Sequence, residues 1–573
     1  MTSETAQTRL LARTFFARLF ESELIPPGIG HARVVISLVA FFAAPSLVLP
    51  LLLMKKYVWL WTPELLRTAM AQDRTMALLL SMTATAFVSL VIWENIFPDR
   101  RDSRILGVLP LRNRSFVVAR LFAIVALFSL VFLLPTAIGS IGFGVLGAMT
   151  QMPEGFFGVA SAYFVAVAAA EGMVFFGIVA IQCALMNVAG PSAAHRLAVV
   201  LQMAIIITVL QMPMVLPAGT SFALDASGSP LWASTASARL LPPLWFLSLH
   251  EWIVGDGYPG TAHLARIAGL LGIGTPVLAL AFYAASYRRL TRLAIEGRPE
   301  PPRKRTPWIA RSVGSLSSLL TAGAEGAAVC AFTLRTLARS RQHRMLLAVW
   351  IGVAIALTIS AALPVLVRFG WSALDRPREA LLVGPFIFAA LAQTGMRSLF
   401  AIPVEIRANW AVRMVETPKL AATLDGASAA LIICGVIPAA VLALASGAWL
   451  WGAKIGILHA LFSGIVALTL SQVLMLRVDR IPFTCTYSPG SAKIGKLWPL
   501  YLTIFSTLTY GMAAAEAEML RRPGPGFVKA VALLIVAATA LRWMRVRRAG
   551  QLPGLCFEAE PDDRFTEVSL RAH

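Results

Sequence analysis

The chain has 573 residues, of which 58% are hydrophobic and only 14% are charged, against roughly 25% charged residues in an average soluble domain. This composition excludes an ordinary soluble globular protein, and the uninterrupted apolar runs exclude a membrane β-barrel, whose strands alternate apolar and polar residues. The 50 Lys and Arg residues outnumber the 29 Asp and Glu residues, giving a formal net charge of +21; in so apolar a chain this excess is typical of positive cytoplasmic loops, not of nucleic-acid binding.

Long apolar runs recur along the whole chain and reach the roughly 20 residues that a helix needs to cross the hydrocarbon core of a bilayer. The sequence therefore predicts an all-α polytopic membrane protein with about 12 transmembrane helices, located in the cell (inner) membrane. The spans predicted in the first half are residues 34–54, 76–93, 116–138, 159–179, 198–215 and 267–285. Those predicted in the second half are residues 346–366, 380–400, 427–450, 455–476, 497–517 and 527–543.

Lysine and arginine concentrate in alternate connections between these spans. Since positive charge marks the cytoplasmic side, both the N and the C terminus are predicted to be cytoplasmic. One strongly basic connection contains Pro301, Pro302, Arg303 and Arg305, a composition typical of a linker. The predicted domains are a first transmembrane bundle at 1–287, a basic cytoplasmic linker at 288–327, a second transmembrane bundle at 328–548 and a cytoplasmic tail at 549–573.

The two halves of the chain begin alike. Residues 9–20 and 332–344 each set arginines among apolar side chains just before the first span of their half, which predicts a basic amphipathic helix at the membrane interface. Each half also carries a charged inner loop between its second and third spans. We interpret the chain as two six-helix bundles related by internal duplication.

The most informative loop is residues 94–115, which read ENIFPDRRDSRILGVLPLRNRS. Charged and apolar residues mix here up to Pro110, so we predict a short amphipathic helix whose charged face is offered to a soluble partner. The alternative is an ordinary positive cytoplasmic loop with snorkelling arginines. The candidate docking residues are Asp99, Arg100, Arg101, Asp102, Arg104, Leu106 and Leu109.

The equivalent loop of the second half, residues 397–420, reads RSLFAIPVEIRANWAVRMVETPKL. Both loops follow a phenylalanine with a proline, a charged cluster, apolar residues and a second proline. The matching residues are Phe97, Pro98 and Pro110 in the first loop and Phe400, Pro403 and Pro418 in the second. The candidate docking residues of the second loop are Glu405, Arg407, Arg413 and Glu416.

In its FPDRRD…LGVLPL loop, and in the arrangement of nearly the whole chain, the protein resembles the permease subunits of ABC-2 type exporters. The resemblance implies that the amphipathic helix before each bundle is an elbow helix and that the two loops are coupling helices, which dock on a separate ABC-type ATPase homodimer. That partner would hydrolyse ATP and this chain would bind no cofactor, its other partner being membrane lipid. The resemblance also implies helices at the outer surface between spans five and six. Residues 216–266 are long enough for them, whereas residues 518–526 are too short unless the preceding span is irregular.

One short stretch imitates a nucleotide-binding site. Residues 490–497, GSAKIGKL, match a phosphate-binding loop except that Leu497 replaces the Ser or Thr that ligates magnesium. We reject this match because it lies in a short loop between two spans with no α/β sequence around it. The cysteines and histidines show no metal-binding spacing either. The chain is therefore predicted to be a transport subunit and not an enzyme.

Glu171 is the most deeply placed ionisable residue in the predicted spans. Since a charge in hydrocarbon costs on the order of 2.5–3.5 kcal/mol on insertion scales, such a residue is a functional candidate by default. Glu171 either lines a translocation path or binds a proton, or it pairs with an arginine of a neighbouring helix for assembly. The polar residues of the spans keep open an alternative function, that of an ATP-independent secondary transporter or lipid-moving membrane protein.

Overall fold

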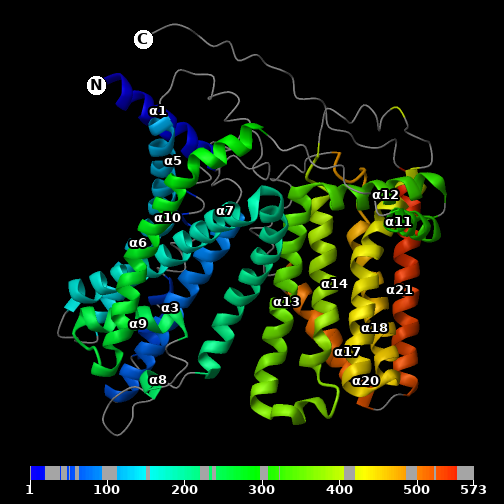
Figure 1. The fold of residues 1–573 in the computed structure, drawn as a ribbon. Coiled ribbons are helices and arrows are strands. Elements are labelled where there is room, and N and C mark those ends of the chain that lie inside the picture. The colour runs from blue at the N-terminus through cyan, green and yellow to red at the C-terminus, as the bar shows by residue number, and fades with distance from the viewer. Residues whose placement is uncertain are drawn as a thin grey trace. The chain divides into compact units, whose positions relative to one another are not determined.

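The computed structural model consists of helices and their connections, without a strand, in the parts of the chain that it describes (Figure 1). Those parts are residues 2–19, 36, 39–40, 48–50, 52–57, 63–92, 113–149, 155–219, 231–234, 240–296, 307–321, 323–404, 414, 420–484, 500–501, 503–521 and 524–551. Within them, eight helices are long and apolar enough to cross a membrane. The prediction of an all-α, multi-pass membrane fold is confirmed.

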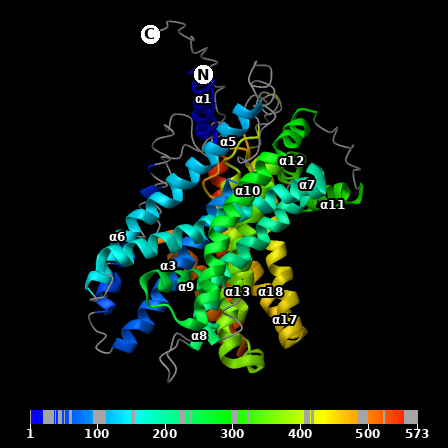
Figure 2. The same cartoon turned by 60° about the vertical axis from the view of Figure 1, so that its left-hand side comes forward.

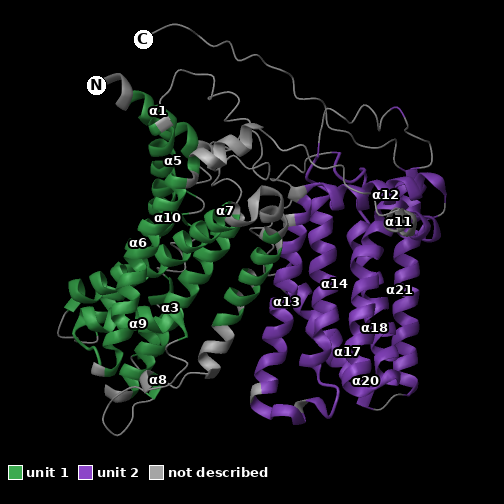
Figure 3. Cartoon of the chain, viewed as in Figure 1, with its two compact units in different colours: residues 1–302 green, residues 303–573 purple. Residues whose placement is uncertain are grey.

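The chain forms two compact units, Met1–Pro302 and Arg303–His573 (Figure 3). The division falls inside the predicted linker at 288–327, which itself contains helix at both ends. The elements of unit 1 are α1 (Thr2–Leu19), α3 (Pro63–Val91), α5 (Asn113–Phe128), the π-helix η1 (Ser129–Leu133), α6 (Leu134–Met149), α7 (Gly155–Gly219), α8 (Leu231–Ser234), α9 (Pro242–Val254), the 3-10 helix η3 (Pro259–Thr261) and α10 (Ala262–Glu296).

Unit 2 begins with a short helix in the predicted linker and continues to Ala549. Its elements are α11 (Pro307–Leu320), α12 (Ala324–Arg339), α13 (Arg341–Phe369), the 3-10 helix η4 (Gly370–Leu374), α14 (Glu379–Leu399), α16 (Leu420–Leu431), the π-helix η6 (Ile432–Val436), α17 (Ile437–Trp451), α18 (Ala453–Met475), the π-helix η7 (Thr507–Gly511), α20 (Met512–Arg521) and α21 (Pro525–Ala549).

The eight candidate spans are Arg114–Met149, Gly155–Leu185, Ala262–Ala285, Leu346–Leu366, Glu379–Leu399, Leu420–Trp451, Ala453–Met475 and Pro525–Ala549. Three lie in unit 1 and five in unit 2. The spans predicted at 76–93 and 198–215 fall in α3 and α7, and the described part of 497–517 falls mostly in η7 and α20, but none of these three is among the eight. The span predicted at 34–54 lies largely outside the described residues.

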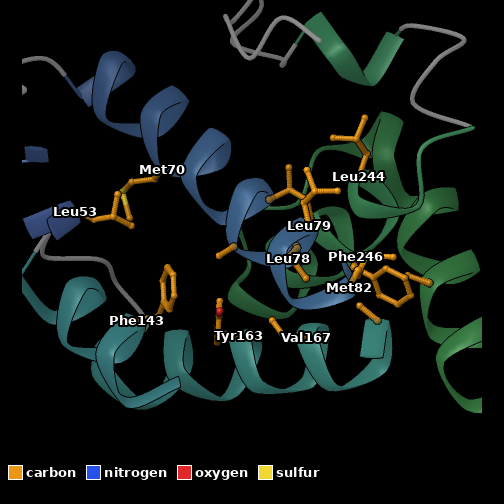
Figure 4. Packing of buried hydrophobic residues seen from close by; sticks show 14 of the residues in the cluster. Leu53, Met70, Leu78, Leu79, Met82, Phe143, Tyr163, Val167, Leu244 and Phe246 are labelled. Carbon is orange, nitrogen blue, oxygen red and sulfur yellow. The ribbon is translucent and has the colours of Figure 1, made fainter. Parts of the chain in front are cut away.

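Unit 1 is built around α7, which packs against α3, α6, α9 and α10. One of its apolar clusters gathers side chains from α3, α6, α7 and α9 (Figure 4). In this cluster the rings of Phe143 and Tyr163 stack with centroids 4.0 Å apart, and Leu244 and Phe246 of α9 are fully buried. In unit 2, α14 packs against α13, α17, α18 and α20, while α18 also packs against α21.

One long candidate span in each unit, Arg114–Met149 in unit 1 and Leu420–Trp451 in unit 2, has the same irregularity. In unit 1, α5 continues through the π turn η1 into α6 as one rod (Figure 2), and Pro135 is the second residue after the turn. In unit 2, α16 continues through η6 into α17, and Pro438 is the second residue after that turn. A helical proline removes a hydrogen bond and its ring clashes with the carbonyl four residues earlier. In both spans that carbonyl belongs to the π turn, whose wider winding accommodates the proline.

The amphipathic helix that precedes each bundle packs on the beginning of this same span. Helix α1 packs on α5, and α12 packs on α16. The sequence placed the second of these helices at 332–344, but it runs from Ala324 to Arg339. The boundary was wrong because Ser340 has an extended backbone, with φ −69° and ψ 120°, which ends α12 and starts α13. The repeated contact supports the predicted duplication.

Candidate functional site

Both predicted coupling loops fall mostly on residues that the structure does not describe. Asp99, Arg100, Arg101, Asp102, Arg104, Leu106 and Leu109 lie in the interval 93–112, and Glu405, Arg407, Arg413 and Glu416 lie in the intervals 405–413 and 415–419. Their docking role stays a prediction. The described residues that flank the second loop nevertheless define how its two ends are held.

The beginning of the second loop is fixed to the start of α13. His343 Nε2 lies 2.9 Å from the carbonyl oxygen of Ile402, and His343 Nδ1 lies 2.7 Å from Ser340 Oγ at the break before α13. Phe483, which follows α18, donates its backbone N–H to the carbonyl of Phe400 at 2.9 Å. Phe483 has a φ of 66°, which is rare for a bulky residue. Such a conformation persists only where surrounding contacts fix it, and here the His343 ring meets the Phe483 ring at 4.7 Å.

Helix α16, which follows the second loop, forms an ion pair with α21 near its beginning. Arg545 of α21 donates a hydrogen bond to Asp425 of α16, and Arg542 lies 3.7 Å from the other carboxylate oxygen. The Asp425 and Arg545 side chains are only 12% and 6% exposed. Removing one partner of so buried a pair would leave the other charge uncompensated, so the contact is costly to break. The residue Ile402, which precedes the undescribed part of the loop, is thus bonded to α13, and α16, which follows the loop, is bonded to α21.

Glu171 is buried in α7, where two hydroxyl groups from other helices hold its carboxyl group. Ser81 Oγ of α3 donates to Oε1, and Thr136 Oγ1 of α6 lies 2.9 Å from both carboxyl oxygens. Glu171 forms no ion pair with any described residue, so its described partners are hydroxyl groups and not the arginine of the assembly alternative. Its actual partners are 90 and 35 residues away in the chain, so the sequence predicted the residue but not its environment.

Unit 2 contains a buried pair that joins α18 to α20. His459 Nδ1 lies 2.9 Å from both carboxyl oxygens of Glu516, and both side chains are 0% exposed. The Phe386 ring of α14 packs edge-on against the imidazole with centroids 6.1 Å apart. Both residues are ionisable groups in predicted spans, and that was the only sequence signal for them. Their pairing depends on the packing of α18 with α20.

A third buried ionisable group, which sequence reasoning missed, lies where α9 packs on α3. His250 and Glu251 of α9 are both buried, and the charge of Arg74 acts on both. Burial lowers the pKa of His250 well below 6.5, and Arg74 lowers it further. Burial raises the pKa of Glu251 to about 8; Arg74 opposes this and Asp256 adds to it. The usable signal was the adjacent pair of ionisable residues inside an otherwise apolar helical segment.

The three buried sites have different chemistry. The Glu171 site holds a carboxyl group between hydroxyls, the His459 site holds an imidazole–carboxyl pair, and the α9 site combines three ionisable side chains. No group of three or more His, Cys, Asp or Glu residues in the described ranges is arranged to hold a metal ion.

No protein-family model, no curated protein and no solved structure matches this chain.

Proposed function

We propose that the chain is the permease subunit of an ABC-2 type exporter. In this proposal its two bundles, of about six spans each, form the translocation path in the inner membrane with both termini in the cytoplasm. The two loops after the second spans couple the path to a separate cytoplasmic ATPase homodimer, which hydrolyses ATP. Rigid-body movement of one bundle against the other would alternate access to the path.

The observation that carries the proposal is the repeated contact between an amphipathic helix and the third span. In unit 1, Phe15 of α1 meets the ring of Phe116 at 6.4 Å, and the Arg120 guanidinium lies 5.1 Å from the Phe15 ring centroid. In unit 2, α12 crosses α16 with Gly326 and Gly426 in backbone contact. A helix that lies at the interface and grips a span is suited to pass movement from a cytoplasmic partner to that span.

The held ends of the second loop support the same conclusion. A push on this loop would load His343 at the start of α13 and Asp425 in α16. Both residues are largely buried, His343 on α13 and Asp425 on α16. The push would therefore move these two helices together instead of deforming the residues at the two ends of the loop. This rigidity is what a coupling element requires.

The decisive experiment is to purify the tagged protein gently from its native membrane and identify stoichiometric partners by mass spectrometry. We expect an ABC-type ATPase, and we expect it to be lost when Arg100, Arg101 and Arg104 are reversed to glutamate. The matched control reverses Arg368, Arg376 and Lys454, which are exposed at the opposite helix ends of unit 2, and should retain the ATPase. Normal ATP-dependent transport by the correctly inserted first mutant would contradict the coupling role.

A second candidate function is an ATP-independent transporter or lipid-moving protein. It is favoured by the buried ionisable side chains of Glu171 and of the His459–Glu516 pair, because such groups in membrane helices mark ion and proton pathways. An activity of this kind should collapse with an uncoupler and survive depletion of ATP. The ABC-2 type exporter should show the opposite pattern.

A further inference from the structure

The two hydrogen-bond partners of Glu171 are hydroxyl groups, which can bind both the ionised and the protonated form of its carboxyl group. A hydroxyl group both donates and accepts a hydrogen bond, whereas an ionised carboxylate only accepts. When Glu171 is ionised, Ser81 and Thr136 can both donate to it. When Glu171 is protonated, its O–H can donate to Thr136 Oγ1, 2.9 Å away, while Ser81 still donates to Oε1. The hydrogen bonds at this site are satisfied in either protonation state.

The matching position in unit 2 lacks this property. Thr136 directly follows the proline after η1, and Ala439 directly follows the proline after η6. Ala439 is buried against Ala467 of α18. Here the second span contributes Gln393, whose Nε2 donates to the Ala467 carbonyl at 3.0 Å. An amide and a backbone carbonyl do not titrate, so no described ionisable group takes the corresponding position beside η6. The buried ionisable pair of unit 2, His459 and Glu516, lies instead between α18 and α20.

Among the described residues, no positively charged side chain forms a hydrogen bond or ion pair with Glu171, whose partners are two hydroxyl groups. The ionisable side chains on α7 and the helices packed against it are Tyr163, Cys183, His195 and Arg196 on α7, Glu64, Arg67, Asp73 and Arg74 on α3, His250 and Glu251 on α9, and His263, Arg266, Tyr283, Tyr287, Arg288, Arg289, Arg292 and Glu296 on α10. Of these, Tyr163 interacts electrostatically with Glu171, and a phenol carries no positive charge. On α10 the nearest residues to this turn of α7 are Gly272 and Pro276, beside Gly172. An ionised carboxylate here depends on the two hydroxyls alone, which makes its charge state responsive to small movements of α3 and α6.

We propose that Glu171, with Ser81 and Thr136, is a proton-binding site of unit 1. The carboxylate takes up one proton from water and returns it, and the two hydroxyls exchange donor and acceptor roles as it does so. Separation of α3 or α6 from α7 removes a hydroxyl and changes the affinity for the proton. The site therefore links protonation to the packing of the second, third and fourth spans. The inference concerns the chain itself and does not depend on whether an ATPase drives transport.

The test is infrared difference spectroscopy of the purified full chain in lipid nanodiscs, titrated from about pH 5 to about pH 9. We expect a carbonyl component of a protonated carboxyl group to be present at low pH, to disappear as the pH rises, and to be missing from Glu171→Gln. Glu251, whose pKa is about 8, gives a component of its own, which Glu251→Gln identifies. Glu516→Gln is the matched control, since it removes a second buried carboxyl group, that of α20, and should leave the band of Glu171 in place.

Two further variants keep the carboxyl group and test the geometry. Ser81→Ala and Thr136→Val each remove one hydrogen bond, so each should shift the frequency of the band without abolishing it. These two variants also test the proposal if the Glu171→Gln protein does not fold. A band that persists at every pH, a band that is absent at every pH, or a band unmoved by both hydroxyl variants would overturn the proposal.

Discussion

The spans Arg114–Met149 of unit 1 and Leu420–Trp451 of unit 2 share a π turn followed by a proline, yet the side chains packed beside that turn differ. Unit 1 places Thr136 there, in contact with the carboxyl group of Glu171, and unit 2 places Ala439, against Ala467. The backbone irregularity is thus compatible with an ionisable neighbour and with neighbours that do not titrate. The π turn is therefore explained by the proline that follows it in both units. The side chains packed beside the turn are not fixed by this backbone feature, and they differ between the units.

The contact between the amphipathic helix and the span on which it packs also differs between the two units. Helix α1 holds α5 through the aromatic ring of Phe15, whereas α12 holds α16 through the close approach of Gly326 and Gly426. In unit 2 the Asp425–Arg545 pair also joins the beginning of α16 to the end of α21. Unit 1 instead has α9, whose His250 and Glu251 are buried against α3. The described part of unit 2 between α20 and α21 is too short for such a helix. The expectation of an irregular preceding span fits the π turn η7.

The largest effect is expected where α21 contacts α16 in unit 2. Arg545→Ala leaves Asp425 without its buried partner and should lower the free energy of unfolding by about 3–5 kcal/mol. Arg542→Ala is the control: this side chain is 59% exposed and 3.7 Å from the carboxylate, so the loss should stay below about 1 kcal/mol. Denaturant titration in detergent measures both, and equal losses would show that Arg545 has no special role.

The next largest effect is expected at the contact between α12 and α16, which depends on close approach of the two backbones and not on an aromatic side chain. A Cβ atom at Gly426 would lie 2.2 Å from the Gly326 carbonyl oxygen, so Gly426→Ala should force α12 away and cost about 1–3 kcal/mol. Gly314→Ala on α11 meets open space and should be neutral or stabilising, because alanine favours helix. Thermal unfolding compares the two variants, and an unaffected Gly426→Ala would mean that α12 is only loosely docked.

A pH effect is expected from α9, which only unit 1 possesses among the described residues. The pKa of Glu251 is raised to about 8, so the folded state binds a proton that the unfolded state has already released. Stability therefore falls as the pH rises toward this value. Between about pH 7 and about pH 8 the loss should be about 1 kcal/mol, and His250 adds little there because it is neutral in both states. Glu251→Gln should flatten this dependence in thermal melts, whereas Glu518→Gln, at an exposed residue, should not.

The smallest effect is expected at the unit 2 counterpart of the Glu171 site. Gln393→Met loses the hydrogen bond to the Ala467 carbonyl but also removes Oε1, a buried acceptor without a partner. These two contributions oppose each other, so the net change in unfolding free energy should stay below about 1 kcal/mol. Denaturant titration tests this. A loss as large as that of Arg545→Ala would mean that the amide holds the three spans together.

The sequence by itself determined the class of fold, and it predicted a linker between two bundles and a functional role for one buried carboxyl group. Hydropathy is a local property, so long apolar runs predicted membrane helices whatever their neighbours, and the basic stretch around Arg303 predicted the boundary between units. Glu171 stood out because a carboxyl group in an apolar run is costly wherever the run packs. The coupling residues such as Arg100 lie outside the described residues and stay predictions.

Only the tertiary structure decided what those residues meet. Ser81 and Thr136 reach Glu171 from two other helices, and His459 meets Glu516 across 57 residues of chain. The charge of Arg74 acts on Glu251, far along the chain in α9. Contacts of this kind depend on which faces of two helices come together, and that is set by the packing of the whole bundle. No pattern within a single helix records it.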